Sequence, residues 1–327
     1  MPFGPLFGED AVWTGAAEVL TVPMDGSAGL VTSMTLTGDD RLLAVGTDAG
    51  DVVLLAASDG KLIRRWTAHP ERINALIVLP GKRLLTASDD HTLKLWDLES
   101  GAERQTFSGH TGWVTSVAAS VDGQRAASGS YDRTVCVWNT ADGTPLAMFS
   151  GHQAGVKAVD FRLDGKQIVS ASVDRTAGAW DIESEKSVLT LKGHHGAVRS
   201  VKFSPDGRQI ATACEDGSVR LWSDQTGDRS HVLSGHAGMV WTLAYAPAGN
   251  LLASGGFDQT VRLWDSQTGK RVAVLRGPKT PICALAFSKD SEQLFVAGQE
   301  RSLYRYRARP AEPPVNAAET SNAEAKP

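Results

Sequence analysis

Residues 235–265 read GHAGMVWTLAYAPAGNLLASGGFDQTVRLWD, and this stretch decides the fold of the chain. It opens on a Gly-His pair and closes on a Trp-Asp pair, and both ends recur along the sequence at steps of 42 residues, with one step of 41 at the second unit. The first column holds Ala68-His69, Gly109-His110, Gly151-His152, Gly193-His194 and Gly235-His236, and the second holds Trp96, Trp138, Trp180, Trp222 and Trp264. Weaker members at Leu55 and Tyr306 extend the second column to seven units. Such a period predicts an array of similar small units rather than a single irregular domain.

Each unit reads as four short strands separated by turn residues. In the first strand the apolar residues stand at i, i+3 and i+5, as in Val198, Val201 and Phe203. One extra residue therefore interrupts a period of two, which predicts a β-bulge. An Asp-Gly turn such as Asp206-Gly207 comes next, and a short hairpin through Asp258 then leads to the third strand. The chain also contains 33 glycines among 327 residues, as many tight turns require.

These columns resemble the WD-repeat family of β-propellers, whose repeat of about 40 to 45 residues runs from Gly-His to Trp-Asp. Trp96-Asp97, Trp180-Asp181 and Trp264-Asp265 keep the full dipeptide, whereas Trp138-Asn139 and Trp222-Ser223 depart mildly. The first unit, from Gly26-Ser27, and the last, from Gly277-Pro278, depart strongly. The resemblance implies an all-β, seven-bladed propeller with four-stranded antiparallel blades.

The phase of the repeat predicts how the ring closes. Residues 18–22 hold the fourth-strand position of a unit, while the last unit ends after its third strand at residues 303–306. We expect the N-terminal strand to complete the last blade, which removes two exposed sheet edges. The predicted division is an N-terminal extension over residues 1–17, a propeller over residues 18–307 and a disordered tail over residues 308–327, where proline is frequent and aromatic residues are absent.

Composition restricts the classes of function. A formal net charge of −4, with 42% hydrophobic and 21% charged residues, describes an ordinary globular protein without a global positive field. Nucleic-acid binding would need a local basic patch. Cys136, Cys214 and Cys283 stand far apart, which suits a reducing compartment. With no long apolar run or basic leader at the start, we expect a cytoplasmic protein without a membrane segment.

Five units carry a His, a Ser or Thr, an Asp and a Trp at matching offsets. Ser, His and Asp together suggest a hydrolase triad. A set that occurs once per unit is better explained by the need of each blade to satisfy buried polar groups. The family resemblance implies that these four residues form a hydrogen-bonded structural tetrad. The tetrads are His69/Thr86/Asp90/Trp96, His110/Ser128/Asp132/Trp138, His152/Ser170/Asp174/Trp180, His194/Thr212/Asp216/Trp222 and His236/Ser254/Asp258/Trp264.

The sequence predicts no metal, no cofactor and no catalytic residue. His194-His195 lacks a third ligand nearby in the sequence, and His194 already belongs to a tetrad. Phosphate-binding and kinase motifs are absent. Two alternatives stay open. One is a metal-dependent, lactonase-like propeller hydrolase, which needs carboxylates converging on the ring axis, and the other is a subunit associated with nucleic acid.

Three positions per unit are expected on one face, around the mouth of the ring. They are the third and fifth residues after the His column and the residue before the hairpin Asp. Aromatic and basic side chains gather at these positions in the middle units, as at interface hot spots. The candidate binding residues are Trp113, Tyr131, Lys157, Arg199, Met239, Trp241 and Phe257. The alternative is that the two tryptophans pack over loops of neighbouring blades. We therefore expect a non-catalytic scaffold that binds partner proteins or peptides as a subunit of a larger complex.

Overall fold

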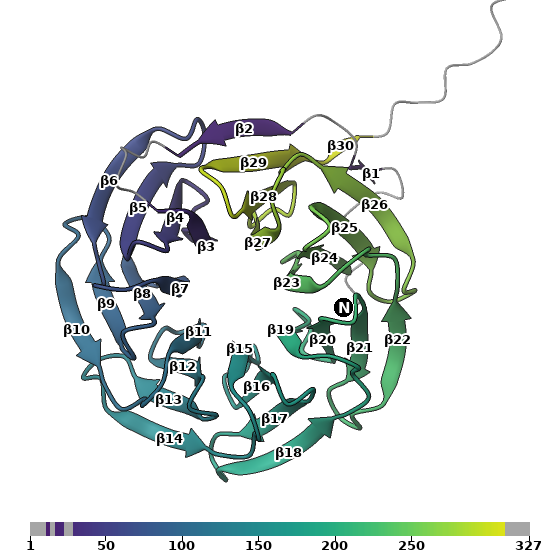
Figure 1. The fold of residues 1–327 in the computed structure, drawn as a ribbon, viewed down its shortest axis with the longest axis horizontal. Helices are drawn as coiled ribbons and strands as arrows, with labels where there is room; N and C mark the ends of the chain where they lie inside the picture. Colours follow the sequence, from purple (N-terminus) through teal and green to yellow (C-terminus); the bar gives the residue numbers. More distant parts are fainter. Residues whose placement is uncertain (1–10, 14–16, 23–28, 311–327) are drawn as a thin grey trace, which may run out of the picture.

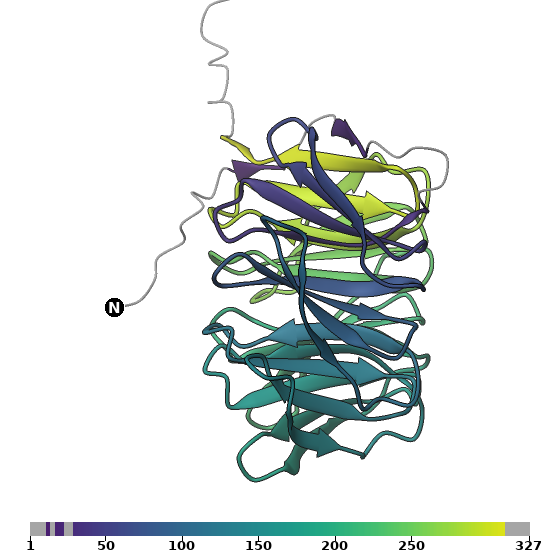
Figure 2. The ribbon, with the colours of Figure 1, turned by 90° about the vertical axis from the view of Figure 1, so that its left-hand side faces the viewer.

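Seven four-stranded antiparallel sheets are arranged as blades around a common axis in the computed structural model, which describes residues 11–13, 17–22 and 29–310 (Figure 1). Seen from the side, the blades form a thick disc (Figure 2). The blades are numbered in sequence order, so that blade 1 spans residues 31–67 and blade 7 is the one that includes the N-terminal strand. Within blades 1 to 6 the strands run from the axis to the rim in sequence order. The predicted all-β, seven-bladed ring is confirmed.

The strand bounds follow the 42-residue period. The innermost strands are β3 (Val31–Leu36), β7 (Ile73–Leu79), β11 (Val114–Ala119), β15 (Val156–Phe161), β19 (Val198–Phe203), β23 (Val240–Tyr245) and β27 (Ile282–Phe287). The second strands are β4 (Leu42–Thr47), β8 (Arg83–Ser88), β12 (Arg125–Ser130), β16 (Gln167–Ser172), β20 (Gln209–Cys214), β24 (Leu251–Gly256) and β28 (Gln293–Gly298). The third strands are β5 (Asp51–Ala56), β9 (Leu93–Asp97), β13 (Val135–Asn139), β17 (Ala177–Asp181), β21 (Val219–Ser223), β25 (Thr260–Asp265) and β29 (Ser302–Arg307). The outermost strands are β6 (Leu62–Thr67), β10 (Glu103–Phe107), β14 (Pro145–Phe149), β18 (Lys186–Leu191), β22 (Arg229–Leu233), β26 (Arg271–Arg276) and, in blade 7, β2 (Glu18–Thr21).

The predicted bulge is present in the inner strand of every blade. In blade 5 the register with β20 shifts between Val198 and Ser200, and the other six blades shift at the matching place. The extra residue explains the apolar spacing, because it turns the following side chains back to the buried face.

The chain closes the ring as predicted. Strand β2 pairs antiparallel with β29, with Glu18 opposite Arg305 (Figure 1). Leu20 and Val22 are buried between blades 7 and 1. The buried Arg305 guanidinium donates to Glu18 and, at 2.8 Å, to the Ala57 carbonyl of blade 1. The N-terminal strand therefore ties the last blade to the first.

A second contact joins the two ends of the chain outside the predicted boundaries. Strand β1 (Ala11–Val12) pairs with β30 (Arg309–Pro310), and Ala308 N donates to Glu292 O at 2.8 Å. The buried Trp13 meets Phe287 edge to face, with ring centroids 6.0 Å apart. The predicted tail begins at residue 308, whereas this ordered pairing extends to residue 310. Residues 311–327 and most of the predicted extension lie outside the described residues.

The apolar core is divided among the junctions between blades. The described residues form seven buried clusters, and each combines side chains from two neighbouring blades. In blades 1 and 7, apolar side chains occupy tetrad positions, with Val45 and Leu55 in one blade and Val296 and Tyr306 in the other. Ser27, the His counterpart in blade 1, lies outside the described residues. The described part of the chain contains no helix with the length and apolar character of a membrane span.

Candidate functional site

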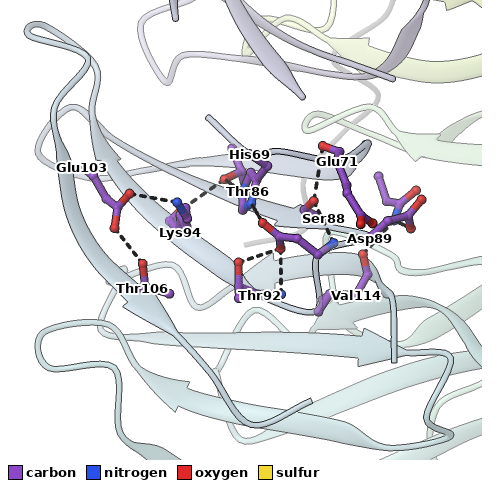
Figure 3. Close-up of polar contacts among 12 residues, drawn as sticks. His69, Glu71, Thr86, Ser88, Asp89, Thr92, Lys94, Glu103, Thr106 and Val114 are labelled. Carbon is purple, nitrogen blue, oxygen red and sulfur yellow. Dashed lines mark hydrogen bonds and ion pairs between the residues drawn. The ribbon is translucent and has the colours of Figure 1, made fainter. Parts of the chain in front are cut away.

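The tetrad of blade 2 joins three parts of the blade through one buried hydroxyl, that of Thr86. Figure 3 shows His69 and Thr86 among their polar neighbours. His69 Nδ1 lies 2.7 Å from the Asp90 carboxylate, and His69 Nε2 lies 2.7 Å from Thr86 Oγ1. Trp96 Nε1 donates to the same hydroxyl at 2.9 Å. Burial by itself would raise the pKa of Asp90, but hydrogen bonds from His69 and Thr92 outweigh it and bring the pKa to about 2.

The same contacts close the tetrads of blades 3, 4 and 6, where the hydroxyl belongs to Ser128, Ser170 and Ser254, respectively. The distances from His Nδ1 to the Asp carboxylate are 2.8, 2.8 and 3.0 Å in these blades. Those from His Nε2 to the serine Oγ are 2.7, 2.8 and 2.8 Å. Each serine hydroxyl also accepts a hydrogen bond from the indole of its own blade, at 2.8, 2.7 and 2.8 Å.

In these tetrads the Asp contacts the His and the His contacts the Ser, as in a hydrolase triad. The serines differ from a catalytic nucleophile because they are buried. Ser128, Ser170 and Ser254 are 0% exposed, as are Thr86 and Thr212 in the other two tetrads. They stand among the candidate site residues of the sequence, yet the structure encloses them inside their blades and away from any ligand-binding surface. A substrate cannot reach such an oxygen, so the arrangement supports a structural role.

Blade 5 departs from the pattern. His194 Nε2 keeps its contact with Thr212 at 2.8 Å, but Asp216 pairs with Arg220 at 2.8 Å instead of with the ring. His194 Nδ1 is buried and has no hydrogen-bond partner. The nearby Arg175 backbone favours the protonated ring and so acts to raise its pKa. Burial, together with the Arg220 charge, lowers the pKa of His194 to about 4. The sequence-predicted tetrad of blade 5 is therefore open between His194 and Asp216.

Two of the three predicted face positions meet in every blade. The backbone N–H of the residue before the hairpin Asp donates to the carbonyl of the third residue after the His column. These pairs are Asp48 to Leu30, Asp89 to Arg72, Tyr131 to Trp113, Val173 to Gly155, Glu215 to Ala197, Phe257 to Met239 and Gln299 to Pro281, at 2.8 to 3.1 Å. The loops before the inner strands and the hairpins consequently share one face of the disc, here called the His face.

The fifth residue after the His column has a role that the sequence analysis missed. In blades 1, 2 and 3 it is Thr32, Asn74 or Thr115, whose side chain donates to an inner-strand carbonyl of the next blade. Cys283 makes the same contact from blade 7 to the Val31 carbonyl, with Sγ and O 3.5 Å apart. Short polar side chains at this position therefore bridge four of the seven junctions.

The same position in blades 4, 5 and 6 holds Lys157, Arg199 and Trp241, whose side chains contact hairpin residues of the His face instead: Tyr131 of blade 3, Glu215 and Phe257, respectively. Lys157 Nζ lies 4.2 Å from the Tyr131 ring centroid and donates to its hydroxyl at 2.6 Å. Arg199 Nε donates to Glu215 at 2.7 Å. Trp241 is half-buried, and its Nε1 is buried without a partner. Three adjacent junctions of the described ring thus lack the bridge.

Exposed aromatic rings flank these three positions. Trp113 and Tyr131 are 49% and 40% exposed and stack edge to face at 5.3 Å. Phe257 is 51% exposed and Met239 36%, and the Phe257 ring lies 5.9 Å from Trp241. The seven predicted residues lie on the His face of blades 3 to 6 and are here called the arc. The alternative that the tryptophans pack over neighbouring loops fits the half-buried Trp241 better than the exposed Trp113.

The described residues contain no group of three His, Cys, Asp or Glu side chains placed to hold a metal ion. His195 is exposed, and its backbone N–H donates to Asp216 at 3.0 Å. The three cysteines are unpaired thiols. Within the described part of the chain, the arc combines exposed aromatic side chains with half-buried basic ones.

Comparisons with known proteins agree with the ring. A family described as the IFT122 first beta-propeller matches residues 78–312, and one described as the anaphase-promoting complex subunit 4 WD40 domain matches residues 10–79. Nuclear distribution protein nudF 1 of Talaromyces marneffei is 42% identical over 66 residues, 20% of this chain and 14% of that protein. The U3 small nucleolar RNA-associated protein 15 homolog of Xenopus tropicalis is 31% identical over 81 residues, 24% and 16% of the two chains. Ribosome assembly protein 4 of Chaetomium thermophilum is 40% identical over 65 residues, 19% and 13%. The chain thus spans 13 to 16% of the length of these curated relatives.

Proposed function

The chain belongs to the WD-repeat β-propeller family, and from that premise we propose that it is a non-catalytic scaffold that binds a partner protein or peptide on the arc. The observation that carries the proposal is the position of the arc. Exposed aromatic side chains of blades 3 and 6 flank the positions of Lys157, Arg199 and Trp241, where the inner-strand bridge to the next blade is missing. Large side chains at a bridging position give up an interblade hydrogen bond, and contact with a partner would offset that loss.

Charge supports an acidic group on the partner. Lys157 contacts the Tyr131 ring and hydroxyl and has no carboxylate partner among the described residues. Arg133 and Arg175, in the adjacent hairpins of blades 3 and 4, are exposed, and their side chains are likewise unpaired in the described chain. The hairpin aspartates beside them are held by the tetrad histidines. We infer that the arc recognises a segment with apolar anchors and at least one carboxylate or other anionic group.

Burial of the five tetrad hydroxyls supports the non-catalytic part of the proposal. A nucleophile must be reached by its substrate, and each of these oxygens is enclosed by its own blade. Two relatives carry names that refer to RNA or to ribosome assembly, so nucleic acid is tested as an alternative ligand.

Affinity capture from native lysate, compared across variants, tests the proposal. Trp113→Ala and Phe257→Ala remove exposed arc rings without opening the core, and Met148→Ala on outer strand β14 removes an equally exposed side chain elsewhere. We expect the main captured protein to be retained by wild type and Met148→Ala and to be lost from both arc variants. Equal capture by all four proteins, or capture that nuclease treatment abolishes, would contradict binding of a protein through the arc.

A further inference from the structure

Blade 6 carries an arginine cluster that the arc does not use. Arg262 lies on β25, and Arg271 and Arg276 lie at the two ends of β26. The Arg262 side chain is only 12% exposed, and its Nε is buried without a hydrogen-bond partner. The nearest carboxylate, Asp258, stands 3.9 Å away and is held by His236, with Nδ1 3.0 Å from both of its oxygens. Arg262 is therefore a largely buried cation with a weak counter-ion.

The neighbouring arginines add further positive charge and do not neutralise that of Arg262. Arg271 and Arg276 are exposed, and neither side chain makes an ion pair or a hydrogen bond with a described residue. Burial, together with the charges of Arg271 and Arg276, lowers the pKa of Arg262. A Cβ placed on Gly235 would lie 2.6 Å from Arg262 Nη1 and 3.9 Å from Arg271 Nη1. The two guanidinium groups consequently converge over the Gly235 backbone.

Blade 5 offers an internal comparison. Arg220 and Arg229 occupy the same two strand positions as Arg262 and Arg271. Arg220 takes Asp216 away from its histidine and so acquires a full counter-ion at 2.8 Å. In blade 6 the carboxylate stays with the histidine instead. The same sequence pattern is thus neutralised internally in one blade and left with spare positive charge in the next.

We propose that blade 6 binds a phosphate group between Arg262 and Arg271. Guanidinium groups bind tetrahedral oxyanions with paired N–H donors, and the absence of a Cβ on Gly235 lets the guanidinium groups of Arg262 and Arg271 approach each other over its backbone. A buried charge without a partner destabilises the fold, so an anion with two negative charges would stabilise it. The site does not depend on the proposed function, because it uses none of the arc residues.

Phosphate titration of the full-length chain tests this site. Melting temperature and calorimetric binding are measured with inorganic phosphate and with a small phosphate monoester, against sodium chloride at matched ionic strength. We expect saturable stabilisation by at least one of the two phosphates. The exposed-residue variant Arg271→Gln should weaken it about ten-fold or more, since it removes a charge-assisted hydrogen bond, and Arg276→Gln, which removes a charge at the other end of β26, should weaken it less. The blade 5 control Arg229→Gln should keep wild-type affinity.

The titration separates the sources of the phosphate as well. Tighter binding of inorganic phosphate points to the free ion, and tighter binding of the monoester points to a phosphorylated small molecule. A stabilisation that chloride reproduces at equal ionic strength would overturn the proposal. An equal loss of affinity in Arg229→Gln and Arg271→Gln would also overturn it, because the effect would then reflect net charge alone.

Discussion

Replacing Arg220 with Met should return Asp216 to His194 and make the protein less sensitive to acid. In the wild-type chain the buried His194 has a pKa of about 4. The folded state therefore favours the neutral ring. The free energy of unfolding consequently decreases as pH falls from the ordinary histidine pKa of 6.5 toward 4. The shift corresponds to about 3 kcal/mol over the whole window and about 2 kcal/mol at pH 5.

The structure indicates what the variant does. Blades 3 and 4 carry Cys136 and Gly178 at the position of Arg220, and in both the aspartate contacts its histidine at 2.8 Å. Met is uncharged and similar in length to Arg, so it leaves Asp216 free to accept from His194 Nδ1. Exchange of a buried ion pair for an apolar side chain is often neutral. We expect a higher pKa of His194 and recovery of roughly 1 kcal/mol of the stability lost between pH 7.5 and pH 5.

Urea unfolding at the two pH values measures the stability, and an NMR titration of the His194 ring measures its pKa. Arg262→Met is the matched control, because Asp258 already contacts His236 in blade 6. It should raise the pKa of His236 less than Arg220→Met raises that of His194, because it removes the Arg262 charge without changing the Asp258 contact. If His194 titrates at the same pH in wild type and Arg220→Met, competition between Arg220 and His194 for Asp216 is not the cause.

Three further predictions concern the ring itself. Deleting residues 1–22 should lower the melting temperature sharply, because burial of Leu20 and Val22 contributes about 1.5 to 3 kcal/mol each; a truncated chain that melts like wild type would contradict the clasp. Asp132→Ala should reduce the free energy of unfolding by about 1 to 3 kcal/mol in chemical denaturation, since it orphans buried donors in blade 3, and an unchanged value would argue against the structural role. Blades 1 and 7, which lack the tetrad, should exchange amide hydrogens fastest, and slowest exchange there would refute this prediction.

The ring could be predicted from the sequence because two columns of residues recur with one period, and each unit repeats the same pattern of apolar and turn residues. The bulge, for example, is visible in the spacing of Val198, Val201 and Phe203. Closure followed from the phase of the first and last units. The β1–β30 pairing could not be foreseen, since two residues at each end carry no pattern and meet only after the ring has brought the ends together.

The details of the site depend on competition in three dimensions. His194 and Asp216 stand in the same columns as their counterparts, but Asp216 pairs with Arg220, whereas Asp258 beside the corresponding Arg262 stays with His236. The bridging role of Thr32 and Thr115 requires a carbonyl of the next blade, which one repeat considered alone does not show. The aromatic residues of the arc were recognised by composition, while their pairwise stacking came from the structure.

Binding of a purified partner to arc variants tests the central claim most directly. The dissociation constant of the main captured protein is measured by calorimetry for wild type, Trp113→Ala and Met148→Ala, after circular dichroism shows that all three are folded. Loss of a hot-spot ring weakens binding by about 2 kcal/mol or more, roughly thirty-fold. We predict that weakening for Trp113→Ala and an unchanged constant for Met148→Ala. Equal constants for all three proteins would place the binding surface outside the arc.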